Sequence, residues 1–422
     1  MSVLSPGRPA EIRRGPARPR PTTLGHRTGF PVVAAAFLVS MAFSAAPTPL
    51  WGVYQRYEHF STFTVTVAFA VYALGVVVSL FLAGHLSDRL GRRRILLPAV
   101  LLEAVSAAVF LSSASLPAVI AARLVSGLGV GMITATATAY LAELHLAARP
   151  GASRARADLA ATAANLGGLA VGPLVSGLLA QYASRPLHTP YLVFLGLLLL
   201  SAAGLAFVPE TVEAAGERTP YRPQRISVPG ASRGTYFAAS AAAFAAFSVL
   251  GLFTSVAPGF VSDALHHPSR ALAGLVAFLV FGAAAAAQPA LARVTAGRRL
   301  AAGLLLMTLG VGGVIAGVRS AHFPLFLASG VAAGAGAGTL FQGAVTTVAA
   351  LAPARARGEA LAGLFLAAYA GLALPILGIG AATRFVTAET ALLGFGTALL
   401  ALAAAIAAHF ARARHGAGPN GR

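Results

Sequence analysis

Long runs of apolar residues alternate along this chain with short polar segments. A helix needs about 20 apolar residues to span the hydrocarbon core of a bilayer, and twelve runs have that character. We predict transmembrane helices at residues 31–54, 63–84, 94–114, 117–142, 158–182, 190–209, 235–258, 271–292, 300–318, 322–349, 359–382 and 386–409. The pattern therefore predicts an all-α membrane protein.

Composition points the same way. The 422 residues are 57% hydrophobic and only 10% charged, whereas soluble domains carry about 25% charged residues. So few charges cannot cover a water-facing surface, which excludes a soluble globular fold. The chain also has no cysteine, which excludes disulfides, thiolate metal sites and a cysteine nucleophile.

The net charge is +19, and the chain contains arginine but no lysine. Such a charge first suggests nucleic-acid binding. The arginines, however, lie outside the apolar runs or at their ends, apart from Arg123, and gather on no single helix or face. We therefore predict a lipid bilayer, and no nucleic acid, as the partner of this chain.

The arginines also set the orientation, because basic loops stay on the cytoplasmic side of a membrane. With the N-terminus inside, few arginines fall in the outside loops: Arg56, Arg185, Arg270, Arg319 and Arg384. We predict that both termini are cytoplasmic. The abundance of alanine, glycine and arginine is typical of GC-rich bacterial genomes, so we place the protein in a bacterial inner membrane.

The chain divides into two similar halves. Gly91-Arg92-Arg93 recurs as Gly297-Arg298-Arg299, and Pro173 recurs as Pro375, at a nearly constant spacing. Parallel repeats of this kind hold a substrate between the halves near the middle of the membrane. The predicted organisation is a disordered basic tail (1–29), a six-helix bundle (30–209), a cytoplasmic linker (210–233), a second six-helix bundle (234–410) and a C-terminal tail (411–422).

A short charged hairpin from Gly84 to Arg94 separates the second and third apolar runs. It resembles the loop between helices two and three of major facilitator superfamily transporters, Gly-x-Leu-x-Asp-Arg-x-Gly-Arg-Arg. The matching residues are Gly84, Leu86, Asp88, Arg89, Gly91, Arg92 and Arg93. The resemblance implies a gating latch in which Asp88 meets the start of helix eleven, near Gly358-Glu359. The alternative is an ordinary positive-inside loop.

The resemblance covers residues 30–410 and is greatest to drug-efflux-like members. It implies two six-helix bundles related by a pseudo-two-fold axis, alternating access, a monomer and no cofactor. It also implies proton-coupled efflux of a small lipophilic or neutral solute. Uptake of a sugar or metabolite by the same fold, and a non-transporting receptor or scaffold, are the alternatives. No His-Glu-x-x-His run or nucleotide-binding loop occurs, so we predict neither an enzyme nor an ATP-driven pump.

Two further helices carry family-like patterns. Arg123 opens a segment that resembles the Arg-x-x-x-Gly-x-Gly pattern of helix four. An arginine inside the membrane indicates function, unless its side chain extends to the outer interface. In helix five, Gly172, Pro173 and Gly177 resemble the Gly-Pro-x-x-x-Gly bend of exporting, proton-exchanging branches. The alternative for that helix is packing of small residues.

Glu103 lies well inside helix three, where an acid should face protein or water and can carry a proton. We therefore interpret Glu103 and Arg123 as candidates for energy coupling. We interpret Glu58 and Glu143, at helix ends, as interfacial. By resemblance, helices one, four, seven and ten should line the substrate path. The candidates there are neutral: Trp51, Tyr54, Tyr140, Phe253, Thr254, Phe341, Gln342 and Thr346.

Overall fold

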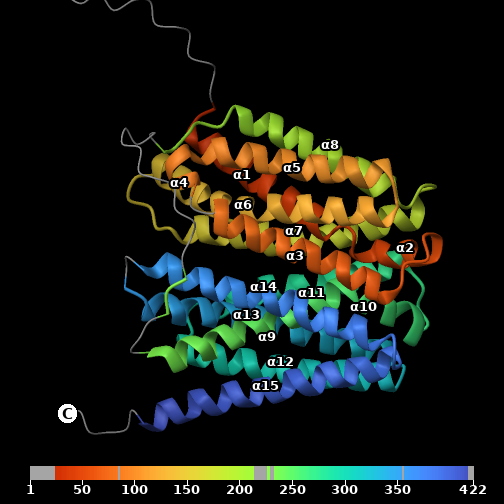
Figure 1. Ribbon diagram of the computed structural model, residues 1–422. Coiled ribbons are helices and arrows are strands. Elements are labelled where there is room, and N and C mark those ends of the chain that lie inside the picture. The colour runs from red at the N-terminus through yellow and green to blue at the C-terminus, as the bar shows by residue number, and fades with distance from the viewer. Residues whose placement is uncertain (1–23, 84–85, 213–225, 229–231, 354–355, 417–422) are drawn as a thin grey trace, which may run out of the picture.

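The computed structural model describes residues 24–83, 86–212, 226–228, 232–353 and 356–416. Gly84 therefore lies outside the described residues. The described chain contains twelve helical spans long and apolar enough to cross a membrane, which confirms the predicted number. Figure 1 shows these spans as two bundles, α1 to α8 and α9 to α15.

The first bundle contains six spans. Its elements are α1 (His26–Ala45), the 3-10 turn η1 (Thr48–Leu50), α2 (Trp51–Tyr57), α3 (Thr62–Ala83), the short α4 (Ser87–Leu90), α5 (Arg92–Ser112), α6 (Leu116–Ala148), α7 (Ala155–Tyr182) and α8 (Thr189–Ala206). The first span is interrupted between α1 and α2 because Pro47 and Pro49 cannot continue a regular helix.

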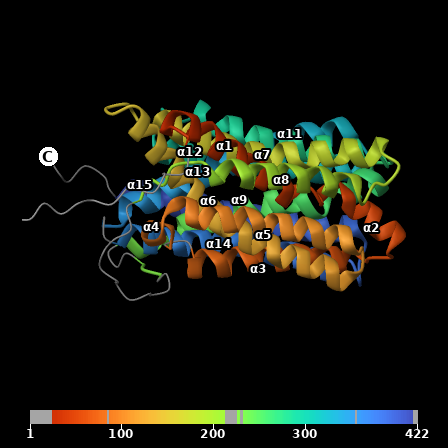
Figure 2. The ribbon, with the colours of Figure 1, turned by 90° about the horizontal axis from the view of Figure 1, so that it is seen from above.

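The second bundle repeats this arrangement. Its elements are α9 (Arg233–Ser255), α10 (Ala257–Gly259), the π-helical turn η3 (Phe260–Ala264), α11 (Arg270–Ala290), α12 (Ala296–Arg319), α13 (Phe323–Leu351), α14 (Arg357–Ala382) and α15 (Ala388–Gly416). Within the described residues, α1 begins and α15 ends at the same end of the molecule (Figures 1 and 2). We call it the arginine-rich end, because Arg89 of α4 and the arginine clusters at the starts of α5 and α12 lie there.

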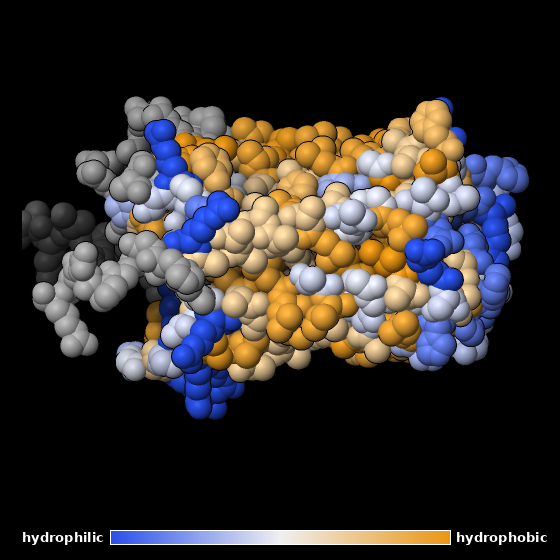
Figure 3. Space-filling view, turned by 90° about the horizontal axis from the view of Figure 1, so that it is seen from below, coloured by the Kyte–Doolittle hydropathy of each residue, from blue (hydrophilic) through white to orange (hydrophobic). Residues whose placement is uncertain are grey.

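The surface matches the pattern expected of a membrane protein. On the face that Figure 3 shows, a broad apolar belt crosses the middle of the molecule and polar side chains gather at its two ends. Many large apolar side chains of the described chain are exposed, for example Leu74, Leu200 and Leu309. In lipid these exposed side chains have apolar surroundings, so the packing inside the bundle depends on close contact and hydrogen bonds.

Glycines bring α12 and α13 into backbone contact along their whole length. Gly303 faces Leu340, Gly310 faces Ala333 and Gly317 faces Phe326. Each step is seven residues on α12 and seven on the antiparallel α13, or about two helical turns. Because a Cβ atom at Gly303 would lie 2.7 Å from the backbone nitrogen of Leu340, this spacing has no room for a side chain.

Two helix pairs join the halves at the end of the molecule opposite the arginine-rich end. On α7 and α11, a Cβ atom at Gly177 would lie 2.5 Å from the carbonyl oxygen of Arg270, and Gly274 packs against Pro173. The guanidinium of Arg270 also donates to the carbonyl of Ala180 over 2.7 Å. On α3 and α14, Gly380 packs against the side chain of Thr66. The halves are therefore tightly closed against each other at this end.

Candidate functional site

A cavity of about 380 Å³ lies between the two bundles. Its walls come from α1, α3, α6 and α7 of the first half and from α9, α11, α13 and α14 of the second. The sequence led us to expect lining from helices one, four, seven and ten. Those helices contribute, and the second, fifth, eighth and eleventh spans contribute as well.

The cavity opens toward the arginine-rich end. Asp158, at the start of α7, lines its mouth with a side chain that is 60% exposed. At the opposite end the lining residues Thr48 and Trp51 are only 3% and 2% exposed. The close contacts of α7 with α11 lie beyond them. The site is therefore reached from one side of the molecule only.

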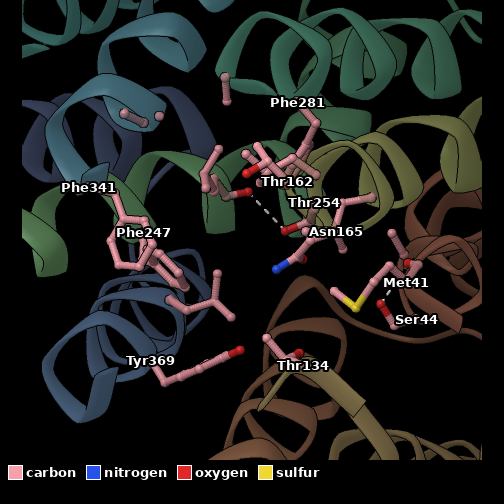
Figure 4. A pocket seen from close by; sticks show the side chains of 18 of the residues that line it. Met41, Ser44, Thr134, Thr162, Asn165, Phe247, Thr254, Phe281, Phe341 and Tyr369 are labelled. Atoms are coloured by element: carbon pink, nitrogen blue, oxygen red, sulfur yellow. Dashed lines mark hydrogen bonds between the residues drawn. The ribbon is translucent and has the colours of Figure 1, made fainter. Parts of the chain in front are cut away.

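The second half supplies an aromatic wall, which we define as Phe247, Phe341, Phe365 and Tyr369 (Figure 4). The ring of Phe247 lies 4.9 Å from that of Phe341 and 5.5 Å from that of Tyr369, measured between centroids. Phe341 in turn lies 5.9 Å from Phe365. These tilted and edge-on contacts are the favoured geometries for aromatic pairs. The wall offers a continuous apolar surface to a ligand.

The first half supplies most of the neutral polar groups. Thr134 and Thr138 lie one turn apart on α6, and Thr162 and Asn165 lie one turn apart on α7. Figure 4 shows the amide of Asn165 pointing into the cavity, across from the aromatic wall. The hydroxyl of Thr134 donates to the carbonyl of Val130 over 2.9 Å, so its oxygen can still accept a hydrogen bond.

Arg123 lies in the cavity wall, near the closed end. It is 2% exposed, so its side chain does not reach the outer interface. One guanidinium nitrogen donates to the carbonyl of Ser44 over 2.8 Å, and the group lies 4.1 Å from the centroid of the Tyr72 ring. A cation over a tyrosine face is stabilised by the ring quadrupole. The arginine is thus held in place without a carboxylate partner among the described residues.

Glu103 of α5 lies behind this wall and is fully buried. The hydroxyl of Ser126 donates to its Oε2 over 3.0 Å, while its Oε1 has no hydrogen-bond partner. A side chain at Gly129 would crowd the carboxyl, so α6 has a glycine where the acid enters. Glu103 and Arg123, the two candidates for energy coupling, form no ion pair with each other in the described chain.

The charged hairpin forms a compact network at the arginine-rich end. Arg92, at the start of α5, forms an ion pair with Asp88 of α4 and a second one with Glu143 of α6, the latter over 2.7 Å. Thr211 donates to Glu143 over 2.6 Å. The carboxylate of Asp88 is thus directed to its own segment rather than to α14, the partner that the family resemblance implied.

Glu210, four residues after the end of α8, completes the network at the start of α5. Its carboxylate accepts hydrogen bonds from the backbone N–H groups of Arg92 and Arg93, at 2.6 and 3.1 Å. These groups open α5, where a helix favours a negative charge. Gly91 adopts φ 109°, a backbone conformation that suits glycine, and a side chain there would collide with Glu210. Arg89 lies on α4 and is exposed.

The glycines of helix five mark close approaches. Gly172 lies against the backbone of Ala42 on α1, and Gly177 lies against Arg270 on α11. Pro173 lies between them, inside a helix that the structure continues from Ala155 to Tyr182. The Gly-Pro-x-x-x-Gly pattern, which the resemblance associates with a bend, therefore lies where α7 contacts α1 of the first half and α11 of the second.

The substrate-path candidates divide into two groups. Trp51, Thr254 and Phe341 line the cavity. Five are not among its lining residues: Tyr54, Tyr140, Phe253, Gln342 and Thr346. Gln342 and Thr346 each follow a lining residue, and one residue along a helix turns the side chain by about 100°. The hydroxyl of Tyr140 donates to the carbonyl of Pro209, and that of Tyr54 to Tyr191.

Several functional residues escaped the sequence reasoning. Glu143 was assigned to the interface but binds Arg92, and Glu210 was assigned to a linker. On α7, the polar residues Asp158, Thr162 and Asn165 follow each other at four and three residues, with apolar or small residues between them. That helical spacing places them on one face, so the stripe was a signal that could have been recognised.

Comparison with known proteins agrees with the fold. The model of the Major Facilitator Superfamily matches residues 32–266. The "Arabinose-proton symporter" of Bacillus subtilis (strain 168) is 34% identical over 128 residues. That match covers 29% of this chain and only 28% of the symporter.

Solved structures resemble the whole bundle. The peptide transporter POT in complex with alafosfalin has a TM-score of 0.74 at 15% identity, covering 92% of this chain and 94% of its own. A bacterial homolog of the human lysosomal transporter Spinster, inward-facing and unoccupied, has a TM-score of 0.71 at 16% identity, with 92% and 97% covered. The human organic anion transporter MFSD10 has a TM-score of 0.65 at 19% identity, with 91% and 100% covered. At these identities the likeness concerns the fold.

Proposed function

The chain belongs to the major facilitator superfamily and is a membrane transporter rather than an enzyme, and we propose that it moves a small, mainly apolar solute by alternating access. One observation carries this proposal. The central cavity lies between two similar bundles and opens at one end only, while glycine contacts close the other end. Rocking the bundles about the cavity would expose the same site to the opposite side.

The arginine-rich end is the cytoplasmic end in this proposal, because basic segments are retained inside. The conformation described above is then inward-facing. Both termini lie in the cytoplasm, and the chain is a monomer in a bacterial inner membrane. The ion pair of Asp88 with Arg92 fits this state, since a latch that holds the cytoplasmic end shut would be released when that end is open.

A proton gradient is the proposed energy source. The sequence has no lysine and so cannot form the usual nucleotide-binding loop. Glu103 is a buried acid with one unpartnered carboxylate oxygen close to the cavity wall. Burial disfavours the charged form of a carboxyl without an ion partner, so protonation can be linked to the conformation of the bundle. Arg123 is the nearby cation that can respond to that change.

Two directions of transport are supported by different observations. The Gly172-Pro173 and Gly177 pattern, which in this chain packs α7 against both halves, favours proton-coupled efflux. The partial match to a proton symporter favours proton-coupled uptake as a second candidate. In both cases the solute is small, because the cavity volume is that of a site for a small organic molecule.

Purified protein in liposomes tests the proposal. An imposed pH gradient should drive accumulation of at least one solute from a panel of lipophilic dyes, antibiotics, aromatic acids and sugars, and collapse of the gradient should abolish it. The side that holds the excess protons distinguishes the two directions. Solute that accumulates on the side with more protons indicates proton-coupled efflux by exchange, and solute that accumulates on the side with fewer protons indicates proton-coupled uptake. The proposal is wrong if no solute moves against its gradient while the protein remains monodisperse and still binds one of the solutes. The chain would then be a receptor or scaffold.

A further inference from the structure

One charged side chain, Arg123, lies in the cavity wall and forms no ion pair among the described residues. The guanidinium of Arg123 contacts the carbonyl of Ser44 and the ring of Tyr72, and its Nε has no hydrogen-bond partner. None of the ion pairs in the described chain includes it. An unpaired buried cation is costly, and an anion bound beside it would remove much of that cost.

The acids on the elements around this arginine form no ion pair with it in the described chain: Glu143 of α6 pairs with Arg92, and Glu359 lies in the first turn of α14. Glu103 is held by Ser126 of α6 and forms no described ion pair with Arg123. Asp158 lies at the open mouth of the cavity, where Arg154 approaches it at 3.7 Å. The positive charge at the closed end therefore remains available to a ligand.

The same cavity has a second recognition surface. The aromatic wall of Phe247, Phe341, Phe365 and Tyr369 comes entirely from the second half, whereas Arg123 comes from the first. A ligand that touched both would bridge the two bundles. Aromatic side chains favour aromatic partners over saturated ones of equal size because of the geometry of their quadrupoles.

We infer that the transported solute is a lipophilic aromatic acid with a single anionic group. Its planar body packs against the aromatic wall, and its anionic group pairs with Arg123. This inference rests on the proposed transport function and names the substrate class. Glu103 is buried behind the wall, and in its protonated form it leaves Arg123 as the one charge at the closed end. That charge matches one negative charge on the solute, and a second charge on the solute would be buried without a partner. The neutral solute expected from the sequence followed from lining candidates that carried no charge.

Binding of matched probes to the purified protein in detergent tests the inference without any transport assay. The probes are naphthoate, its uncharged analogue naphthamide, and decahydronaphthoate, which keeps the charge and loses the aromatic ring. Naphthoate should bind about tenfold more tightly than naphthamide, the order expected for a charge-assisted contact in a buried site. It should also bind several-fold more tightly than decahydronaphthoate. Equal binding of all three probes, or no binding of naphthoate, would overturn the inference.

Variants separate recognition from a structural role. Arg123→Gln should weaken naphthoate about tenfold and leave naphthamide unchanged, whereas Arg123→Lys should retain most of the affinity. Arg319→Gln is the matched control, because that arginine is 64% exposed at the outer end of α12. Equal losses for naphthoate and naphthamide would mean that Arg123 only supports the fold. If Arg123→Gln does not yield monodisperse protein, the inference is tested by the affinities of the three probes for the unchanged chain and for Arg123→Lys.

The two proposals fail in different ways. The transport proposal fails if no solute follows an imposed pH gradient, even when naphthoate binds. The substrate inference fails if sugars or neutral dyes are driven by the gradient while naphthoate neither binds nor competes with them.

Discussion

The guanidinium of Arg92 and the carboxylate of Glu143 are joined over 2.7 Å, although 51 residues separate them in the sequence. Their contact ties the start of α5 to the last turns of α6 at the arginine-rich end. The side chain of Arg92 is 10% exposed and that of Glu143 is 33% exposed. This pair, with Asp88 and Glu210 around it, holds the first bundle together where the hairpin turns.

Loss of one member of this pair should destabilise the protein. Arg92→Gln leaves Glu143 partly buried without its partner, and we expect a loss of about 3 kcal/mol in stability. Thermal unfolding in detergent should show a clearly lower midpoint. Arg94→Gln is the control, because Arg94 is exposed in the same turn of α5. Equal midpoints for the two variants would show that the network contributes little.

The seam between α12 and α13 predicts a contrast between two glycines of one helix. Gly310→Ala forces a Cβ atom into the backbone of Ala333 and should cost about 1–3 kcal/mol. Gly312→Ala meets nothing within 4 Å and should be neutral or slightly stabilising, because alanine is the better helix former. Unfolding midpoints of both variants provide the measurement. A stable Gly310→Ala protein would contradict the close packing.

The closed end should open when its glycine contact is enlarged. Gly177→Ala places a Cβ atom 2.5 Å from the carbonyl oxygen of Arg270, so it should disfavour the closed outer end. The chain has no native cysteine, so Thr48→Cys can report access from outside with an impermeant maleimide. Labelling should increase several-fold. Gly167→Ala, which has open space around it, should leave labelling unchanged.

Glu103→Gln should uncouple transport from the proton gradient. The amide keeps the size and the hydrogen bond with Ser126 but cannot exchange a proton. We expect loss of pH-driven accumulation while exchange of solute down its own gradient continues. Glu58→Gln, at an exposed acid after α2, is the control. Unchanged accumulation in Glu103→Gln would exclude this residue as the coupling group.

Asp88→Asn should weaken the latch. Its ion pair with Arg92 is largely solvent-exposed at Asp88, so stability should change little. If Asp88 meets α14 when the cytoplasmic end closes, the variant should spend more time inward-facing and transport more slowly. Labelling of Asn165→Cys from the cytoplasmic side should rise together with the loss of transport. Asp263→Asn, an exposed acid at the other end, is the control. Full activity of Asp88→Asn would argue for an ordinary basic loop.

The number of spans could be predicted from the sequence, because the bilayer imposes a length on each apolar run. The hairpin was also recognisable, since Asp88, Gly91 and Arg92 stand at fixed spacings. The acids that bind the hairpin could not be predicted from the sequence. Glu143 and Glu210 lie 51 and 118 residues from Arg92, and nothing near either acid identifies the arginine it binds.

The lining of the cavity was harder to predict for a physical reason. In a membrane bundle, the lipid-facing and core-facing sides of a helix are both apolar, so hydrophobic periodicity does not reveal which side faces inward. On α13 the structure places Phe341 in the cavity wall, whereas Gln342 beside it is not among the lining residues. Where a helix carried its own polar stripe, as with Thr162 and Asn165 on α7, the inward side was visible in the sequence.

The register of α12 against α13 limits how the second half can move. Gly303, Gly310 and Gly317 meet their partners at equal steps, so sliding one helix by a single residue would set side chains against backbone at three levels together. We therefore expect α12 and α13 to move together as one rigid body during the transport cycle. Any rearrangement inside that half then falls to α9, α11 and α14, which border the cavity together with α13.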